Sequence, residues 1–314
     1  MDIYCIGEMV IDFIPGKEPA SYIRNLGGAP ANVAIAAAKN GLKAGFCGKV
    51  GDDDFGHFLA DTLKENQVDY LCRNFCRDAV TTMAFVTLTE KGERSFTFAR
   101  KPGADMFLTQ HDIRESDIES AKIVHAGSCS LSKEPAASAT VYALRLAHQK
   151  GKMVSFDINY RNLLWDNDYD AAVRKVDEVL SYVDLLKISE EEAGMVGGTE
   201  RLFPLMKEKK LTLVVETLGA NGARCFFDGR VLKVEGTKAK PVDTTGAGDA
   251  FWAGFLSSLI HQGVERLPDL SAAKIKKAMD YGNIAGSVCI LSKGAISSLP
   301  TRAQVEEYLE KGFD

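Results

Sequence analysis

A short glycine-rich segment in the C-terminal third carries the most distinctive chemistry of this sequence. Residues 241–251 read Pro-Val-Asp-Thr-Thr-Gly-Ala-Gly-Asp-Ala-Phe, and a helix is expected directly after the turn, from Ala250 to His261. Gly246 and Gly248 let the backbone turn tightly, so that successive N–H groups can converge on one point. Because the helix N-terminus adds unpaired donors and partial positive charge, the segment is suited to hold a phosphate or another anion.

Asp249 ends this turn, where its carboxylate can reach a hydroxyl group beside the anion. Phosphoryl transfer requires little more than a positioned nucleophile, a base and electrostatic stabilisation of the transferring group. The alternative is that Asp249 only caps its helix and that the glycines only shape a loop. Two other phosphate-binding designs are excluded. The chain lacks the G-x-x-x-x-G-K-[ST] pattern, and Phe251 occupies the place of the third glycine in a dinucleotide fingerprint.

The composition is that of a globular protein and excludes several classes of function. The 314 residues are 46% hydrophobic and 26% charged, and their net charge of −5 predicts no general attraction to nucleic acid or to anionic membranes. The N-terminus lacks the features of a secretion signal, and no run of about 18 apolar residues predicts a membrane span. Seven dispersed cysteines favour reduced thiols in the cytoplasm over a disulfide framework.

Short β-rich runs alternate along the chain with longer segments of helical spacing. This alternation predicts an α/β fold with a mainly parallel sheet covered on both faces, which binds ligands beyond the C-terminal ends of its strands. The expected strands are Ile3–Ile6, Ala44–Val50, Ile123–Ala126, Met153–Phe156, Leu185–Ile188 and Leu213–Thr217. The expected helices include Ala31–Asn40, Phe55–Glu65, Ala136–Gln149 and Ala171–Leu180.

Two segments break this alternation. Thr81–Thr89 and Arg94–Arg100 predict two strands joined by a turn at Glu90–Glu93, and Phe13–Arg24 also reads as extended because it contains prolines and a glycine. We expect these segments to form a small β lid inserted into the α/β domain; an ordinary surface hairpin is the alternative. The predicted division is an α/β domain of residues 1–12, 26–71 and 108–314 and a lid of residues 13–25 and 72–107.

Several motifs, in order along the chain, resemble those of a known family. Val242–Phe251 resembles the C-terminal signature of the PfkB, or ribokinase-like, carbohydrate kinases, and Gly27–Ala34 resembles their N-terminal signature. Gly7–Asp12, Val50–Gly56, Thr217–Gly222 and Lys293–Ala295 agree as well, so the resemblance covers nearly the full chain. It implies a ribokinase-like three-layer fold and an enzyme that transfers the γ-phosphoryl group of ATP to a hydroxyl of a small carbohydrate.

The resemblance also implies roles for individual residues. Asp249 matches the general base, and the backbone amides of Gly246, Ala247 and Gly248 match the anion hole. The positions that match the sugar site are Asp12, Gly27, Gly28 and Asn32, with Arg100 and Arg161 as further candidates. The positions assigned to the nucleotide are Thr217, Gly219, Gly222, Gly248 and Asn283, together with Ser189. Lys187 is a further candidate because it ends an apolar strand, where its charge could meet a phosphate.

Two cation sites follow from the same resemblance. Glu192 matches the acidic position that organises Mg²⁺ through its waters, although Ser189 replaces the asparagine usual in this element. A sparse acidic motif is sufficient for Mg²⁺, which keeps several waters and usually takes one or two carboxylates plus substrate phosphates. Asp243, the carbonyl of Thr245 and carbonyls near Cys289–Ser298 match a monovalent-cation site, which makes K⁺ a further candidate.

The sequence limits the identity of the sugar substrate to a few candidates without selecting one. Ala29–Asn32 together with Asp157–Trp165 is similar to fructokinases, and similar strings occur in 2-keto-3-deoxygluconate kinases and aminoimidazole riboside kinases. Fructose is therefore the expected substrate. Because an arginine can pair with a carboxylate as well as with hydroxyls or phosphates, Arg100 and Arg161 keep an acidic keto-sugar open.

For the basic residues Arg161 and Lys187, a structural ion pair is the alternative to ligand binding. Arg161 could instead form a surface ion pair with Asp166 or Asp168, and Lys187 could pair with Glu190 rather than meet a phosphate. A structural role is likewise the alternative for Arg100, at the end of a predicted lid strand.

Other functions remain open at this stage. A nucleoside kinase would need an aromatic platform in the acceptor pocket, and a sugar or nucleotide sensor would have the same fold without catalysis. Because lid strands with apolar faces often need a cover, we expect a homodimer formed partly through the lid. No nucleic acid or membrane partner is expected.

Overall fold

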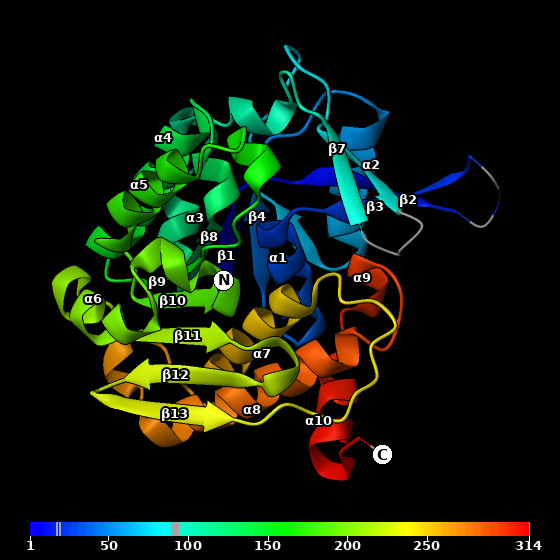
Figure 1. The fold of residues 1–314 in the computed structure, drawn as a ribbon. Helices are drawn as coiled ribbons and strands as arrows, with labels where there is room; N and C mark the ends of the chain where they lie inside the picture. The colour runs from blue at the N-terminus through cyan, green and yellow to red at the C-terminus, as the bar shows by residue number, and fades with distance from the viewer. Residues whose placement is uncertain (17, 19, 89–93, 314) are drawn as a thin grey trace.

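The computed structural model describes residues 1–16, 18, 20–88 and 94–313 and is built around one large sheet (Figure 1). The sheet has nine strands in the order β13-β12-β11-β10-β9-β8-β1-β4-β5. Neighbouring strands from β11 to β5 are parallel, and only β12 and β13 are antiparallel additions. The strands are β1 (Ile3–Ile6), β4 (Ala44–Cys47), β5 (Val68–Tyr70), β8 (Ile123–Gly127), β9 (Met153–Asp157), β10 (Leu185–Ser189), β11 (Leu213–Thr217), β12 (Ala223–Phe227) and β13 (Arg230–Val234).

Helices cover both faces of this sheet and bury two separate apolar clusters against it. One face packs against α1 (Ala29–Lys39), α2 (Asp54–Glu65), α7 (Ala247–His261) and α8 (Ala272–Cys289). The other face packs against α3 (Glu115–Ser120), α4 (Ala136–Gln149), α5 (Tyr169–Leu180) and α6 (Leu202–Lys209). Two short helices, α9 (Ala295–Ser298) and α10 (Arg302–Lys311), end the chain. The predicted three-layer α/β fold with a mainly parallel sheet is confirmed.

A second sheet of four strands lies apart from the first, at the edge of the molecule (Figure 1). Its order is β3-β2-β6-β7, with β2 (Val10–Pro15), β3 (Tyr22–Gly27), β6 (Met83–Leu88) and β7 (Arg94–Ala99). The expected hairpin is present as the antiparallel pair β6 and β7, while its predicted turn at residues 90–93 lies outside the described residues. The smaller sheet is therefore present as a separate sheet. The boundaries between lid and α/β domain stay a prediction.

Helix α7 begins three residues earlier than the sequence pattern predicts, at Ala247 instead of Ala250. Gly246 has a left-handed backbone with φ 78° and serves as the N-cap, so the glycine-rich turn runs directly into the helix. Along α7, Gly254 lies against α8, where an added Cβ would be 2.9 Å from the Cβ of Ala285. This close packing holds α7 against α8, and α7 carries the glycine-rich turn at its N-terminus.

No helix in the described part of the chain is both long enough and apolar enough to cross a bilayer.

Candidate active site

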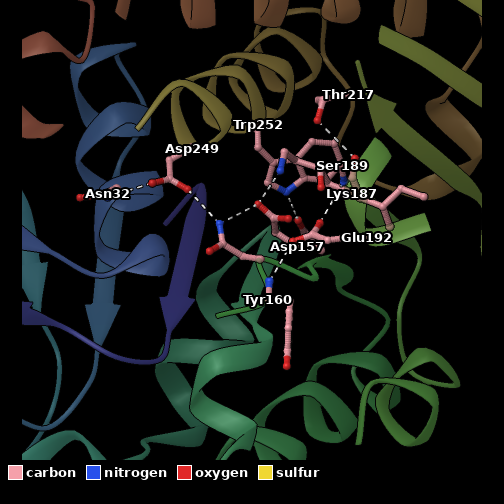
Figure 2. A network of polar contacts seen from close by, with 12 residues as sticks. Asn32, Asp157, Tyr160, Lys187, Ser189, Glu192, Thr217, Asp249 and Trp252 are labelled. Atoms are coloured by element: carbon pink, nitrogen blue, oxygen red, sulfur yellow. Dashed lines mark hydrogen bonds and ion pairs between the residues drawn. The ribbon is translucent and has the colours of Figure 1, made fainter. Parts of the chain in front are cut away.

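Asp249 lies in the first turn of α7, buried, and contacts Asn159 just beyond the C-terminal end of β9. Its side chain is 7% exposed. One carboxylate oxygen accepts a hydrogen bond from Asn32 Nδ2 at 2.8 Å, and the other accepts one from Asn159 Nδ2 at 3.4 Å (Figure 2). Among the described residues no side chain caps α7, so the carboxylate is held by side chains of other segments and not by its own helix.

The surroundings of Asp249 pull its pKa in both directions, and burial is the largest influence. Desolvation disfavours the charged form and raises the pKa to about 6. The hydrogen bond from Asn32 lowers it, the nearby carboxylate of Asp157 raises it, and the positive charges of Lys187 and Arg161 lower it. A carboxylate with a pKa near 6 is a stronger base than an exposed aspartate and is still largely ionised at neutral pH.

One cleft opens in front of this carboxylate, and we call it the Asp249 cleft. Asp12 from β2, Gly28 at the N-cap of α1, Asn32 from α1 and Arg161 line it together with Asp249. Other lining residues of this cleft are Glu8, Phe98, Cys129, Asn159, Leu164 and Gly246. The structure thus brings together four of the six residues predicted for a sugar site.

Gly27 and Gly28 shape this cleft through their backbone. A Cβ at Gly27 would lie 2.2 Å from Asp12 Oδ2, so a larger residue would displace that carboxylate. Gly28 has φ 104°, and its Cβ would lie 2.4 Å from the carbonyl oxygen of Glu8. Burial raises the pKa of Asp12 to about 7; Arg161 lowers it and Asp249 raises it. Asp12 therefore titrates close to neutrality.

The two candidate arginines occupy different places. Arg161 lines the Asp249 cleft, and its Nη1 donates to the carbonyl of Tyr160 at 2.9 Å. The alternative ion pairs are not formed in the described structure, because Asp166 pairs with Lys133 and Asp168 caps α5. Arg100 lies behind the wall of the cleft, in a buried ion pair described below, so the structure does not bring it to the cleft surface.

A second cleft lies on the other side of the glycine-rich turn, and we call it the Asn283 cleft. Five of the seven residues predicted for the nucleotide line it: Thr217, Gly219, Gly222, Gly248 and Asn283. Gly222 has φ 88°, and a Cβ there would lie 2.1 Å from the carbonyl of Val234, so only glycine fits this turn. Asn283 Nδ2 donates to the carbonyl of Glu235 at 2.8 Å, which ties α8 to the strand end beside the cleft.

A third hollow, the Lys187 pocket, adjoins both clefts. It shares Asn159 and Arg161 with the Asp249 cleft, and Thr217 and Gly248 with the Asn283 cleft. Its other predicted members are Lys187, Ser189 and Glu192.

Lys187 forms a buried ion pair with Asp157, at 2.8 Å between Nζ and Oδ2. The alternative pair with Glu190 is therefore wrong, because β9 and β10 are adjacent parallel strands and place residue 157 directly opposite residue 187. Burial opposes the charge of Lys187, but Asp157, Glu192 and Asp249 together raise its pKa. A Cβ at Gly248 would lie 3.5 Å from Nζ, so this cation sits beside the glycine-rich turn.

Glu192 is held by two backbone amides. Its Oε2 accepts from the amide of Ser189 at 2.9 Å, and its Oε1 accepts from the amide of Tyr160 at 2.8 Å (Figure 2). Ser189 and Glu192 thereby form a capping box at the end of β10. With both oxygens already engaged, the carboxylate suits contacts to a cation through water better than direct ligation.

Asp243 ties the turn to the end of α8. Its Oδ1 accepts from the amide of Thr245 at 2.9 Å and from Thr245 Oγ1 at 2.7 Å, and its Oδ2 accepts from the amide of Gly294 at 3.2 Å. The thiol of Cys289 faces the carbonyl of Thr245 at 3.6 Å. Within the described residues no cluster of three or more histidine, cysteine or acidic side chains could hold a metal.

Asn159 and Asp157, which the sequence did not assign to the site, connect Asp249 with Lys187. Asn159 donates to Asp249 at 3.4 Å and to Asp157 Oδ2 at 3.5 Å, so a polar chain runs from Asn32 through Asp249, Asn159 and Asp157 to Lys187 (Figure 2). The available signal was the order Asp157-Ile158-Asn159 directly after a buried strand, because ligands bind beyond the strand ends of such sheets.

Comparison with known proteins gives a consistent set of relatives. The chain is 39% identical over 319 residues to probable fructokinase-7 of Arabidopsis thaliana, which covers 98% of this chain and 92% of the relative. A fructokinase of Xylella fastidiosa with bound ATP superposes with a TM-score of 0.90 at 28% identity, covering 99% of this chain and 98% of that one.

A fructokinase of Vibrio cholerae O395 with fructose, ADP and calcium ion bound has a TM-score of 0.88 at 36% identity, covering 98% of each chain. A double mutant of the same enzyme holds fructose, ADP and a potassium ion. The model of the pfkB family of carbohydrate kinases matches residues 1–302. A match of this length, with relatives along nearly the whole chain, establishes that the protein belongs to the pfkB carbohydrate kinase family.

Proposed function

We propose that this protein is an ATP-dependent fructokinase, which transfers the γ-phosphoryl group of ATP to a hydroxyl of fructose. One observation carries the proposal: the two clefts meet at four consecutive residues of one turn. Gly246 and Asp249 line the Asp249 cleft, whereas Ala247 and Gly248 line the Asn283 cleft. A sugar hydroxyl in one cleft and the end of a nucleotide in the other would therefore meet at this turn.

In this proposal Asp249 is the general base. It takes the proton of the attacking hydroxyl as the oxygen bonds to the γ-phosphorus and the bond to the leaving ADP oxygen breaks. The amides of Gly246, Ala247 and Gly248, at the N-terminus of α7, stabilise the negative charge on the transferring group. Lys187, beside Gly248, adds a positive charge on the same side.

Fructose is the proposed acceptor because two lines of support agree. Asp12 and Asn32 offer carboxylate and amide groups that can exchange several hydrogen bonds with a polyol. The relatives named above are fructokinases, and one of them holds fructose in its structure. Thr217, Gly219, Gly222 and Asn283 are the residues proposed to hold the nucleotide.

Cations complete the proposed site. The carboxylate of Glu192 fits Mg²⁺ held through water, and bound Mg²⁺ would neutralise charge on the nucleotide phosphates. For K⁺, the proposed ligands are Asp243 and the carbonyl of Thr245; support comes from a relative that holds a potassium ion.

The decisive variant is Asp249→Asn. We expect it to keep the fold and sugar binding but to lower kcat by about 10²- to 10⁴-fold, because the amide cannot accept the hydroxyl proton. The measurement is ADP release with a panel of sugars, ATP, Mg²⁺ and K⁺, repeated with a chelator and with K⁺ omitted.

The matched control is Asp61→Asn, the same change at an exposed position on α2, which should leave kcat unchanged. Near-normal turnover of Asp249→Asn would remove this residue from the mechanism. Saturable sugar binding by the wild type without ADP release from any sugar would instead identify a sensor.

The proposed assembly is a homodimer through the smaller sheet, and the proposed compartment is the cytoplasm. Tyr22 and Ile23 of β3 are 48% and 57% exposed on the outer edge of this sheet, which supports a covered face there. The seven cysteines are free thiols, which suits a reducing compartment. Fractionation of cells that express the tagged chain tests the compartment.

A further inference from the structure

Arg100 is held in a buried ion pair with Asp105 of the short helix Ala104–Phe107. Arg100 Nε and Nη2 both donate to Asp105 Oδ2, at 2.9 Å and 2.7 Å, and the two side chains are only 7% and 2% exposed. The remaining nitrogen, Nη1, donates to Ser132 Oγ and to the carbonyl of Leu164, at 3.2 Å each. Every guanidinium nitrogen therefore has a partner, and Thr82 holds the second oxygen of Asp105.

This ion pair lies directly behind the wall of the Asp249 cleft. Leu164, which accepts from Arg100, lines the cleft itself. Ser132, the other partner, donates in turn to the carbonyl of Cys129, which also lines the cleft. The guanidinium is thus one residue away from the cleft and is turned towards Asp105 instead of towards a ligand.

The charged side chains that line the cleft are mainly acidic. Glu8, Asp12 and Asp249 line it with carboxyl groups, and Arg161 is the one cation among its described lining residues. Glu8 is 4% exposed, and its Oε2 has no hydrogen-bond partner in the described structure. A ligand carboxylate at this end would meet three carboxyl groups and Arg161 as the one lining cation, whereas sugar hydroxyls can donate to the carboxyl oxygens.

We propose that Asp105 is a specificity-determining residue, which keeps Arg100 out of the cleft and so restricts the acceptor to neutral sugars. This inference rests on the proposed kinase function and names the substrate class of that site. Without the charge of Asp105, the guanidinium would be free to turn towards the cleft, where an arginine can pair with a carboxylate. Asp105 acts through Arg100 and is a positioning residue.

The test is the Asp105→Asn variant, assayed with fructose and with 2-keto-3-deoxygluconate. We expect the ratio of kcat/KM for fructose to that for the sugar acid to fall about 10- to 100-fold, chiefly through a lower KM for the acid, as one new charge-assisted hydrogen bond predicts. An unchanged ratio in the folded variant overturns the inference. Turnover of fructose by the wild type is a separate readout, and its absence would count against the proposed function alone.

Two controls isolate the guanidinium. The double variant Asp105→Asn with Arg100→Gln should lose the gain for the acid; if the gain persists, Arg100 is not its source and the inference is wrong. Asp112→Asn breaks another buried ion pair, with Lys49, away from the cleft, and should leave the ratio unchanged.

A milder variant covers the case in which Asp105→Asn does not fold. Glu8→Gln removes the carboxyl that faces both the cleft and Arg100, and it should lower the KM for the sugar acid severalfold relative to that for fructose. Glu65→Gln, at an exposed position on α2, is its matched control. The same KM ratio in both variants would contradict the inference.

Discussion

At the scale of the residue, Asp249 is buried and lies near the ion pair of Asp157 and Lys187. Removal from water raises its pKa to about 6, while Asn32 and the cations Lys187 and Arg161 limit that rise. The surroundings therefore keep the carboxylate basic enough to take a proton and still mostly ionised at neutral pH. The proposed role of Asp249 as general base depends on this balance, which a fully exposed or a fully isolated carboxylate would lack.

This balance predicts the acid limb of the pH profile. Because the base must be ionised, kcat for fructose should be flat above neutrality and fall about tenfold per pH unit well below pH 6. Asn32→Ala removes the hydrogen bond that lowers the pKa, so the limb of kcat should move to higher pH. A pH profile measured under saturating substrate checks both, and an unmoved limb in this variant would contradict the assignment.

At the scale of the element, the junction of turn and helix decides which residues line the two clefts. The left-handed backbone of Gly246 lets the chain enter α7 at Ala247, so that Gly246 and Asp249 line one cleft while Ala247 and Gly248 line the other. The neighbouring helix α8 holds α7 in place at Gly254. The same turn therefore sets the position of Asp249 and of the amides proposed to form the anion hole.

Gly246→Ala tests this junction. The nearest atom to an added Cβ is 3.7 Å away, so the cost comes from the backbone at φ 78° and should be about 1 kcal/mol of stability. Because the strain falls on the anion hole, we expect kcat to fall at least about tenfold. Gly151→Ala is the control, since its φ is 67° with no atom within 4 Å. It should show a similar stability loss in chemical denaturation with unchanged kcat; an equal loss of kcat would refute this role for Gly246.

At the scale of the whole molecule, the smaller sheet supplies residues to the site and also presents an edge to solvent. Asp12 from β2 and Phe98 from β7 line the Asp249 cleft, while Ile23 of the edge strand β3 is 57% exposed. A partner that covers this edge would also hold the strands that carry Asp12. Assembly and sugar affinity are therefore expected to be coupled.

Ile23→Lys is expected to weaken the proposed dimer and to raise the KM for fructose severalfold, because a charge would be buried at the interface. Light scattering across micromolar concentrations measures the assembly. Val231→Lys, at a position 41% exposed on β13, is the matched control and should leave the dimer intact. A wild-type protein that stays monomeric over this range would contradict the proposal.

Local sequence patterns predicted much of the candidate site. Glycines at 246 and 248 followed by Asp249 indicated the anion-binding turn, and the alternation of strands and helices indicated the sheet whose strand ends gather the ligand-binding segments. These features are readable because turn geometry and strand or helix periodicity are local properties of the backbone. The order of family motifs then assigned residues far apart in the chain to one site.

Contacts between distant segments were decided only by the tertiary structure. Lys187 meets Asp157 instead of Glu190 because the register of two parallel strands sets them opposite each other. Arg100 turns towards Asp105 and away from the cleft because folding buries both charges, and a buried charge must be paired. The sequence by itself determined which groups could do chemistry, since that follows from residue type and local geometry. Which charge faces the substrate and which is neutralised depends on packing across the sheet, which local pattern does not encode.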